Sequence, residues 1–233
     1  MIILALVVAA LSFTLSASAG LGGSLILVPA MSLLLGSKEG IAVAALLLGI
    51  NNIFKVWAYR RTIPLKAAMG VLVLTMAGAA LGARLMVAAP KHWVDIAIII
   101  SFTLSFLVES RKWFTFRKAL ALFFAFFSGA TSGFSGTSGP LKGVALRSLN
   151  LERMYFVGAA SVVSLAGDAV KTSIFLRSSL VNHNTTLTIL LSAIVIMPFA
   201  VYLGRFINEE IGERSYAALF WTVMAGYTAR LIF

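Results

Sequence analysis

Two lysines inside apolar stretches are the residues of this sequence whose type and spacing best fit binding chemistry. Lys55 closes the run NIFK, which begins at Asn52, and Lys171 closes the run DAVK, which begins at Asp168. In a helix, the polar residue that opens each run lies one turn before the lysine on the same face. An ionisable group inside a membrane segment indicates a functional site, and an ammonium group calls for an anion, so both runs are candidate anion sites.

Each member of these runs also has a plainer interpretation. Asp168 is the one carboxylate that the sequence places deep in an apolar helix, which makes it a candidate for carrying a proton, but it can equally neutralise Lys171 in an ion pair. Lys55 lies near its predicted helix end and can extend its ammonium group to the membrane interface. Asn51 and Asn52 would make either helix-to-helix hydrogen bonds or ligand contacts, and the sequence leaves both open.

A second candidate set lies in two interruptions rich in glycine, serine and threonine. Residues 20–25 read GLGGSL and residues 136–141 read GTSGPL, 116 positions later. Irregular backbone at membrane depth is tolerated only where protein buries it or where it lines a watery cavity. The backbone N–H groups of such a segment, together with the helix N-terminus that follows, favour an anion. The candidate binding residues are Gly20, Gly22, Gly23, Ser135, Gly136, Thr137, Ser138 and Gly139. The alternative is that these small residues let helices pack closely.

The composition excludes an ordinary soluble domain. Hydrophobic residues make up 60% of the 233-residue chain and charged residues only 12%, which indicates a polytopic membrane protein. The net charge of +11 is explained by basic cytoplasmic loops rather than by nucleic-acid binding. No cysteine is present, and His92 and His183 have no neighbours at metal-ligand spacing, so we expect no metal, no cofactor and no enzymatic activity.

Apolar runs and their breaks predict an all-α fold. Residues 1–19 resemble a secretory signal, but their correspondence with the second half favours a structural helix. The expected helices span residues 1–18, 25–35, 41–59, 65–88, 92–108, 119–132, 141–149, 152–176, 187–207 and 216–233.

The matched interruptions predict two homologous halves within one membrane transport domain, residues 1–233. Repeat 1 covers about residues 1–110 and repeat 2 about residues 117–233, each with a broken or re-entrant segment and three transmembrane helices. Leu81-Gly82 and Leu203-Gly204 form a further matched pair. If the broken segments are full crossings the repeats run parallel, and if they are re-entrant the repeats are inverted. The distribution of basic residues favours inverted repeats.

At these residues the sequence resembles the sulfite exporter TauE/SafE family, also called the TSUP transporters. The resemblance rests on G-x-G-G-x-x-x-x-x-P in GLGGSLILVP from Gly20, on S-G-x-S-G-x-x-G from Ser132 to Gly139, and on LGAR from Leu81 to Arg84. The second segment departs from the family pattern, because Thr137, Ser138 and Pro140 interrupt its glycine run.

The resemblance implies a secondary transporter, an exporter, of sulfite, thiosulfate or organosulfonates such as sulfoacetate. We expect a multi-pass protein of the cell inner (plasma) membrane whose partners are the lipid bilayer, a small anionic substrate and a coupling proton at Asp168. The anion would sit between the two interruptions, near Lys55 or Lys171, and move as the halves rock about it. A partner-binding assembly subunit and a passive anion channel are the alternatives.

Overall fold

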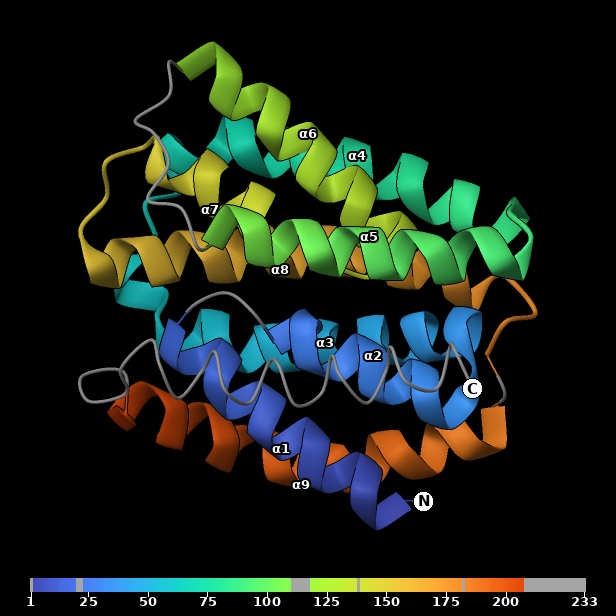
Figure 1. Cartoon of the computed structure of the whole chain (residues 1–233). Coiled ribbons are helices and arrows are strands. Elements are labelled where there is room, and N and C mark those ends of the chain that lie inside the picture. The colour runs from blue at the N-terminus through green and yellow to red at the C-terminus, as the bar shows by residue number, and fades with distance from the viewer. Residues whose placement is uncertain (1, 20–22, 110–117, 138, 182, 208–233) are drawn as a thin grey trace.

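The computed structural model describes residues 2–19, 23–109, 118–137, 139–181 and 183–207, and within them the chain is entirely helical (Figure 1). The elements are α1 (Ile2–Ala19), α2 (Gly23–Leu35), α3 (Ser37–Ala58), the short 3-10 helix η1 (Arg60–Thr62), α4 (Leu65–Ala88), α5 (Lys91–Glu109), α6 (Lys118–Ser135), α7 (Gly139–Arg147), α8 (Arg153–Leu176) and α9 (His183–Ile207). The all-α expectation is confirmed. The helix predicted over residues 216–233 lies outside the described residues.

Two predicted boundaries were wrong. We expected a polar link over residues 36–40, but α3 already begins at Ser37, because Gly36 alone makes the turn with φ of 92°. We also expected the second interruption to begin after Ser132, whereas α6 continues to Ser135. Gly133 is therefore helical, and a side chain there would overlap the backbone of α4 at Ala79 and Gly82.

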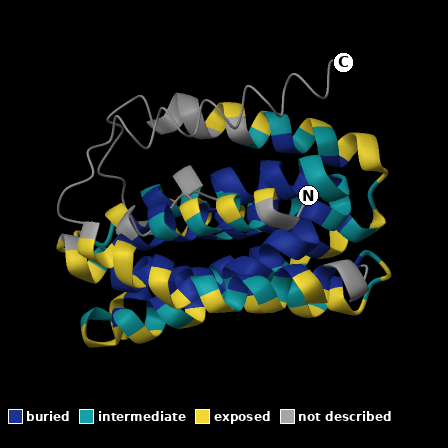
Figure 2. Ribbon diagram, turned by 90° about the horizontal axis from the view of Figure 1, so that it is seen from below, coloured by how far each residue is buried: buried dark blue, intermediate teal, exposed yellow. Residues whose placement is uncertain are grey.

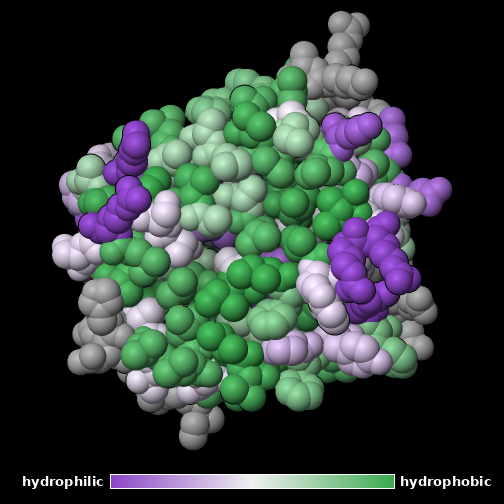
Figure 3. Space-filling view, turned by 180° about the vertical axis from the view of Figure 1, so that it is seen from behind, coloured by the Kyte–Doolittle hydropathy of each residue, from purple (hydrophilic) through white to green (hydrophobic). Residues whose placement is uncertain are grey.

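Four of the described helices are long and apolar enough to cross a membrane, namely α3, α4, α8 and α9. The segments on either side of the interruptions, α1, α2 and α6, have shorter apolar cores. The outer surface is suited to lipid: Val195 and Phe199 on α9 are 66% and 74% exposed, and the rear face is largely hydrophobic (Figure 3). The chain is a polytopic membrane protein.

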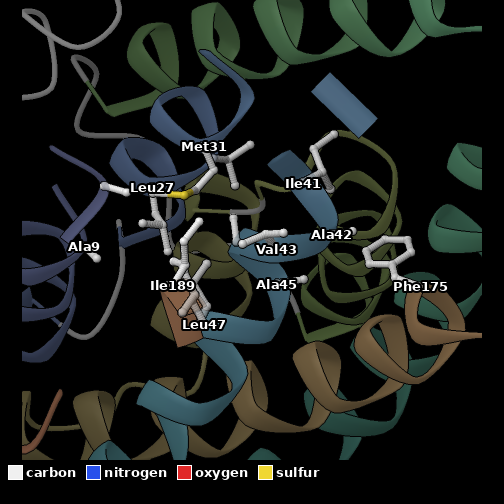
Figure 4. Packing of buried hydrophobic residues seen from close by; sticks show 14 of the residues in the cluster. Ala9, Leu27, Met31, Ile41, Ala42, Val43, Ala45, Leu47, Phe175 and Ile189 are labelled. Carbon is white, nitrogen blue, oxygen red and sulfur yellow. The ribbon is translucent and has the colours of Figure 1, made fainter. Parts of the chain in front are cut away.

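The helices lie in layers, with α3 and α8 at the centre (Figure 1). α4 packs with α6 on one side of this centre, and α1 packs with α9 on the other. Buried residues are concentrated in the middle layers, while the outer helices carry the exposed ones (Figure 2). The main cluster of buried hydrophobic residues joins Leu27 and Met31 of α2 to Leu47 of α3, Phe175 of α8 and Ile189 of α9 (Figure 4).

The two halves have the same helix order and spacing. α1, α2 and α3 begin at residues 2, 23 and 37, and α6, α7 and α8 begin 116 positions later, at residues 118, 139 and 153. α4 and α9 follow in turn. Each half then packs its first helix on the other half, because α1 contacts α9 and α6 contacts α4.

Glycines allow the first helix of each half to pack closely against the other half. A side chain at Gly82 on α4 would overlap the carbonyl oxygen of Ala130 on α6, and one at Gly204 on α9 would overlap the carbonyl oxygen of Thr14 on α1. Ala130 lies 116 positions after Thr14. Gly82 and Gly204 therefore make equivalent close contacts with the first helix of the opposite half. Small residues at such contacts let two membrane helices approach closely.

α3 and α8 correspond to each other and run in opposite directions. Gly49 of α3 lies against Thr172 near the end of α8, whereas Thr62, beyond α3, lies against Gly158 near the start of α8. Figure 1 shows the same opposition for α1 and α6 and for α4 and α9.

Candidate functional site

The two interruptions lie side by side. Ser24, one residue into α2, has its hydroxyl oxygen 3.4 Å from that of Thr137 in the second interruption. Gly136 takes a φ of 81°, and a Cβ there would come within 2.8 Å of the side chain of Val28. Glycine is therefore required at Gly136 both by its backbone angle and by the closeness of α2.

Lys55 and Lys171 are both buried, with 1% of each residue exposed. Lys55 Nζ donates to Ser16 Oγ at 3.0 Å, and Lys171 Nζ donates to Ser132 Oγ at 2.8 Å. Each lysine lies 39 positions after its serine, so the two bonds are counterparts. The interface position that Lys55 might have taken is thus excluded, because its side chain turns into the protein.

Asn52 and Asp168, which are also counterparts, hydrogen-bond to each other. Asn52 Nδ2 donates to Asp168 Oδ2 at 2.7 Å across the contact between α3 and α8. The other oxygen, Asp168 Oδ1, lies 2.8 Å from Lys171 Nζ in an ion pair. The Asp168 carboxylate thus accepts a hydrogen bond from the neutral Asn52 of the first half and pairs with the charged Lys171 of its own half.

Lys142 joins this group and was missed as a site residue at the level of sequence. It lies half-buried on α7, directly after the second interruption, and its Nζ donates to Ser164 Oγ at 2.8 Å. Ser164 precedes Asp168 by one turn of α8, and the charge of Lys142 acts on Lys55, Lys171 and Asp168. The available signal was a lysine in a short apolar helix at the position where the first half has Ile26.

Ser16 and Ser132 were also missed, although both precede the interruptions at matched positions. Their hydroxyls hold the two lysine ammonium groups inside the protein. A polar residue that recurs at the repeat spacing of 116 was the signal that could have found them.

The remaining predicted site residues fall into three groups. Asn51 is fully buried, and neither of its side-chain polar atoms has a hydrogen-bond partner among the described residues. Ser135 faces away from the lysines, since its hydroxyl donates to the Thr131 carbonyl at 2.9 Å and lies 2.8 Å from Ser101 Oγ. Gly20, Gly22 and Ser138 lie outside the described residues, and the ordered helices resume at Gly23 and Gly139.

Gly23 is held against α1 by close packing. Ser12 Oγ donates to the Gly23 carbonyl at 2.7 Å, and a Cβ at Gly23 would lie 2.6 Å from Ser16 Cβ. The first interruption therefore places α2 directly beside the serine that binds Lys55.

Together these residues form a buried cluster with an excess of positive charge, which we call the lysine cluster: Lys55, Lys142, Lys171 and Asp168. In their ordinary protonation states it holds three ammonium groups and one carboxylate. Buried charge is costly unless it is paired, so the cluster is suited to a bound anion. No group of three or more histidine, aspartate or glutamate residues that could hold a metal ion occurs in the part of the chain that the structure describes.

Comparison with known proteins places almost the whole chain in one family. The family model described as "Sulfite exporter TauE/SafE" matches residues 4–231. Among curated proteins and solved structures, no significant match to the chain was found.

Proposed function

Because the chain belongs to the sulfite exporter TauE/SafE family, and so is a multi-pass membrane transporter of sulfite or related anions, we propose that the lysine cluster is its substrate site. The substrate would be a small sulfur oxyanion or organosulfonate, such as sulfite, thiosulfate or sulfoacetate. The observation that carries this proposal is the excess of ammonium groups over carboxylates in a cluster where Lys55 and Lys171 are only 1% exposed.

The chemistry of the cluster fits a sulfonate head group. Its oxygens accept hydrogen bonds, and ammonium groups on three different helices can donate from several directions. The hydroxyls of Ser16, Ser132 and Ser164 already accept from the lysines, which fixes the amines in place. Asn51 offers a further amide that is buried and free of partners among the described residues.

The arrangement of the halves supports transport by alternating access. Corresponding helices α3 and α8 run antiparallel and meet at Asn52 and Asp168, as expected for inverted repeats with a site at their junction. Rocking of one half against the other would open the lysine cluster to each side of the inner membrane in turn. Asp168 would take up a proton when its partner Lys171 engages the anion.

The proposal is tested by flux into proteoliposomes. Purified protein should carry labelled sulfite, sulfoacetate or thiosulfate above the level of empty vesicles, and Lys171→Ala should carry none of them. Lys66→Ala is the matched control, because Lys66 is an exposed lysine in the first turn of α4. Flux of no tested anion by a folded wild-type protein would refute the proposal.

A further inference from the structure

A second polar site lies at one end of the bundle and is lined by none of the residues of the lysine cluster. It is a pocket of about 230 Å³ where the C-terminal end of α3, η1 and α9 meet the start of α8. Three arginines line it, Arg60, Arg61 and Arg205, together with the buried Tyr59 and with Met154 in the first turn of α8. None of its lining residues in the described part of the chain is acidic.

The arginines are held in place by bonds that leave most of their donors unused. Arg205 Nη1 donates to the Ala58 carbonyl at 3.1 Å, and its guanidinium carbon lies 5.8 Å from the centre of the Tyr59 ring. Arg60 Nη1 donates to the Trp57 carbonyl at 3.0 Å, with its guanidinium 4.8 Å from the Trp57 ring. Each guanidinium has five N–H donors, so these bonds leave donors that can face an oxyanion.

Exposed aromatic residues lie within three positions of the lining residues Ala58 and Arg205 in the sequence. Trp57, Tyr202 and Phe206 are 68%, 75% and 72% exposed. Aromatic rings of this kind gather at the level of lipid head groups. Figure 3 shows hydrophilic residues gathered at this end of the molecule beside the broad apolar face. The pocket therefore lies at the membrane interface, where phosphate groups are concentrated.

The other end of the bundle lacks the same set of residues. Tyr59, Arg60 and Arg61 correspond at the spacing of 116 to Phe175, Leu176 and Arg177. Because α3 and α8 run antiparallel, Arg177 lies at the opposite end from Arg61. The pocket is thus a feature of one membrane face, which also carries Lys66 at the start of α4, and basic residues gathered on one face indicate the cytoplasmic side.

We propose that this arginine pocket binds a phosphate-type oxyanion on the cytoplasmic face, presented by the head group of an anionic lipid or as a free ion. The three guanidinium groups supply charge and directed donors, and the pocket volume of about 230 Å³ is large enough for one phosphate. The inference depends on membrane insertion but not on which anion the lysine cluster carries.

Thermal unfolding of the full chain in nanodiscs tests this inference. We expect phosphatidylglycerol added to phosphatidylcholine to raise the unfolding midpoint if a lipid head group is the ligand. Inorganic phosphate at constant ionic strength should raise it in phosphatidylcholine alone if the free ion is the ligand. Either shift supports the site, and the pattern identifies the source.

Variants connect the shift to the pocket. Arg61→Gln should weaken the apparent affinity for the anion, read from the concentration that raises the unfolding midpoint, about fivefold. This is the loss typical of one basic residue at an anionic surface. Arg177→Gln, the counterpart outside the pocket, should leave it unchanged. Both midpoints are first measured in phosphatidylcholine, and if Arg61→Gln fails to fold, Arg60→Gln replaces it. Absence of any shift in the wild type, or equal shifts in the Arg61 and Arg177 variants, would overturn the inference.

Discussion

The first half of the lysine cluster is neutral apart from one amine, whereas the second half carries nearly all the charge. Lys55 and Lys171 occupy matched positions and bind matched serines. Beyond that pair, the second half has Lys142 where the first has Ile26, which is a buried hydrophobic residue. A common scaffold thus holds different chemistry in its two halves.

The same contrast occurs at the junction of α3 and α8. Asp168 stands where the first half has Asn52, and these two counterparts are bonded to each other. The aspartate brings a carboxylate to the junction, whereas the asparagine side chain is a neutral amide. Corresponding helices of the two halves thus supply the geometry, while residues specific to the second half supply the charge.

Where the halves are alike, the same substitution at corresponding glycines should cause a similar and severe loss of folded protein. Gly82→Val and Gly204→Val each force a side chain into the backbone of the neighbouring helix, so we expect loss of most folded protein from both. Yield and monodispersity after purification measure this.

Gly167→Ala is the control for these glycines, because the nearest atom to a Cβ there is 3.4 Å away, on the side chain of Thr75, and no backbone atom is nearer. It should fold normally. Tolerance of valine at only one of Gly82 and Gly204 would show that the two contacts are not equivalent.

Where the halves differ, substitution of the two lysines should destabilise the protein to different extents. Lys171→Met leaves the Asp168 carboxylate buried without its ion-pair partner, which typically costs about 3 kcal/mol and should lower the unfolding midpoint by roughly 10 °C. Lys55→Met removes the hydrogen bond to Ser16 but leaves no carboxylate without its ion-pair partner, so we expect a smaller loss of stability than for Lys171→Met. Thermal unfolding in detergent compares the two variants.

The double variant Lys171→Met with Asp168→Asn should recover most of the lost stability, because no buried carboxylate remains. Equal midpoints for Lys171→Met and Lys55→Met would contradict the difference between the halves.

Asp168→Asn makes the junction symmetric. We expect sulfite flux through this variant to lose its response to a pH gradient while sulfite binding is retained, because the cluster keeps all three amines. Flux at several imposed gradients, compared with wild type, is the measurement. A wild-type response in a well-folded Asp168→Asn protein would remove the aspartate from the coupling step.

The matched serines should give the smallest and most equal effects. Ser16→Ala and Ser132→Ala each remove the acceptor of one buried ammonium group, at a cost of about 1.5 kcal/mol in the free energy of unfolding. Ser173→Ala, an exposed serine on α8, should change it little. A loss for Ser173→Ala as large as the losses for Ser16→Ala and Ser132→Ala would show that the two buried serine hydroxyls do not stabilise the lysines.

Sequence patterns predicted most of the fold. The apolar runs predicted α4 with its observed ends, and they predicted α1 and α2, and α6 and α7, as separate helices. The end of α6 was wrong because Gly133 is a helix-packing residue, and sequence alone does not distinguish a packing glycine from a breaking one.

The site was predicted in part. Lys55, Lys171, Asn52 and Asp168 do come together, because polar residues in apolar helices turn toward the protein interior. Lys142 was missed because it has no counterpart in the first half, and Ser135 faces α5 because its side of α6 depends on packing that the pattern does not specify.

The most direct test of the account is sulfite binding to a protein whose second half is given the residue of the first. Lys142→Ile copies Ile26, removes one of three ammonium groups, and should weaken sulfite binding about tenfold or more in a titration of purified protein. Lys66→Met, which removes an exposed lysine, should bind as wild type does. If folded Lys142→Ile protein binds sulfite with wild-type affinity, the lysine cluster is not the anion site.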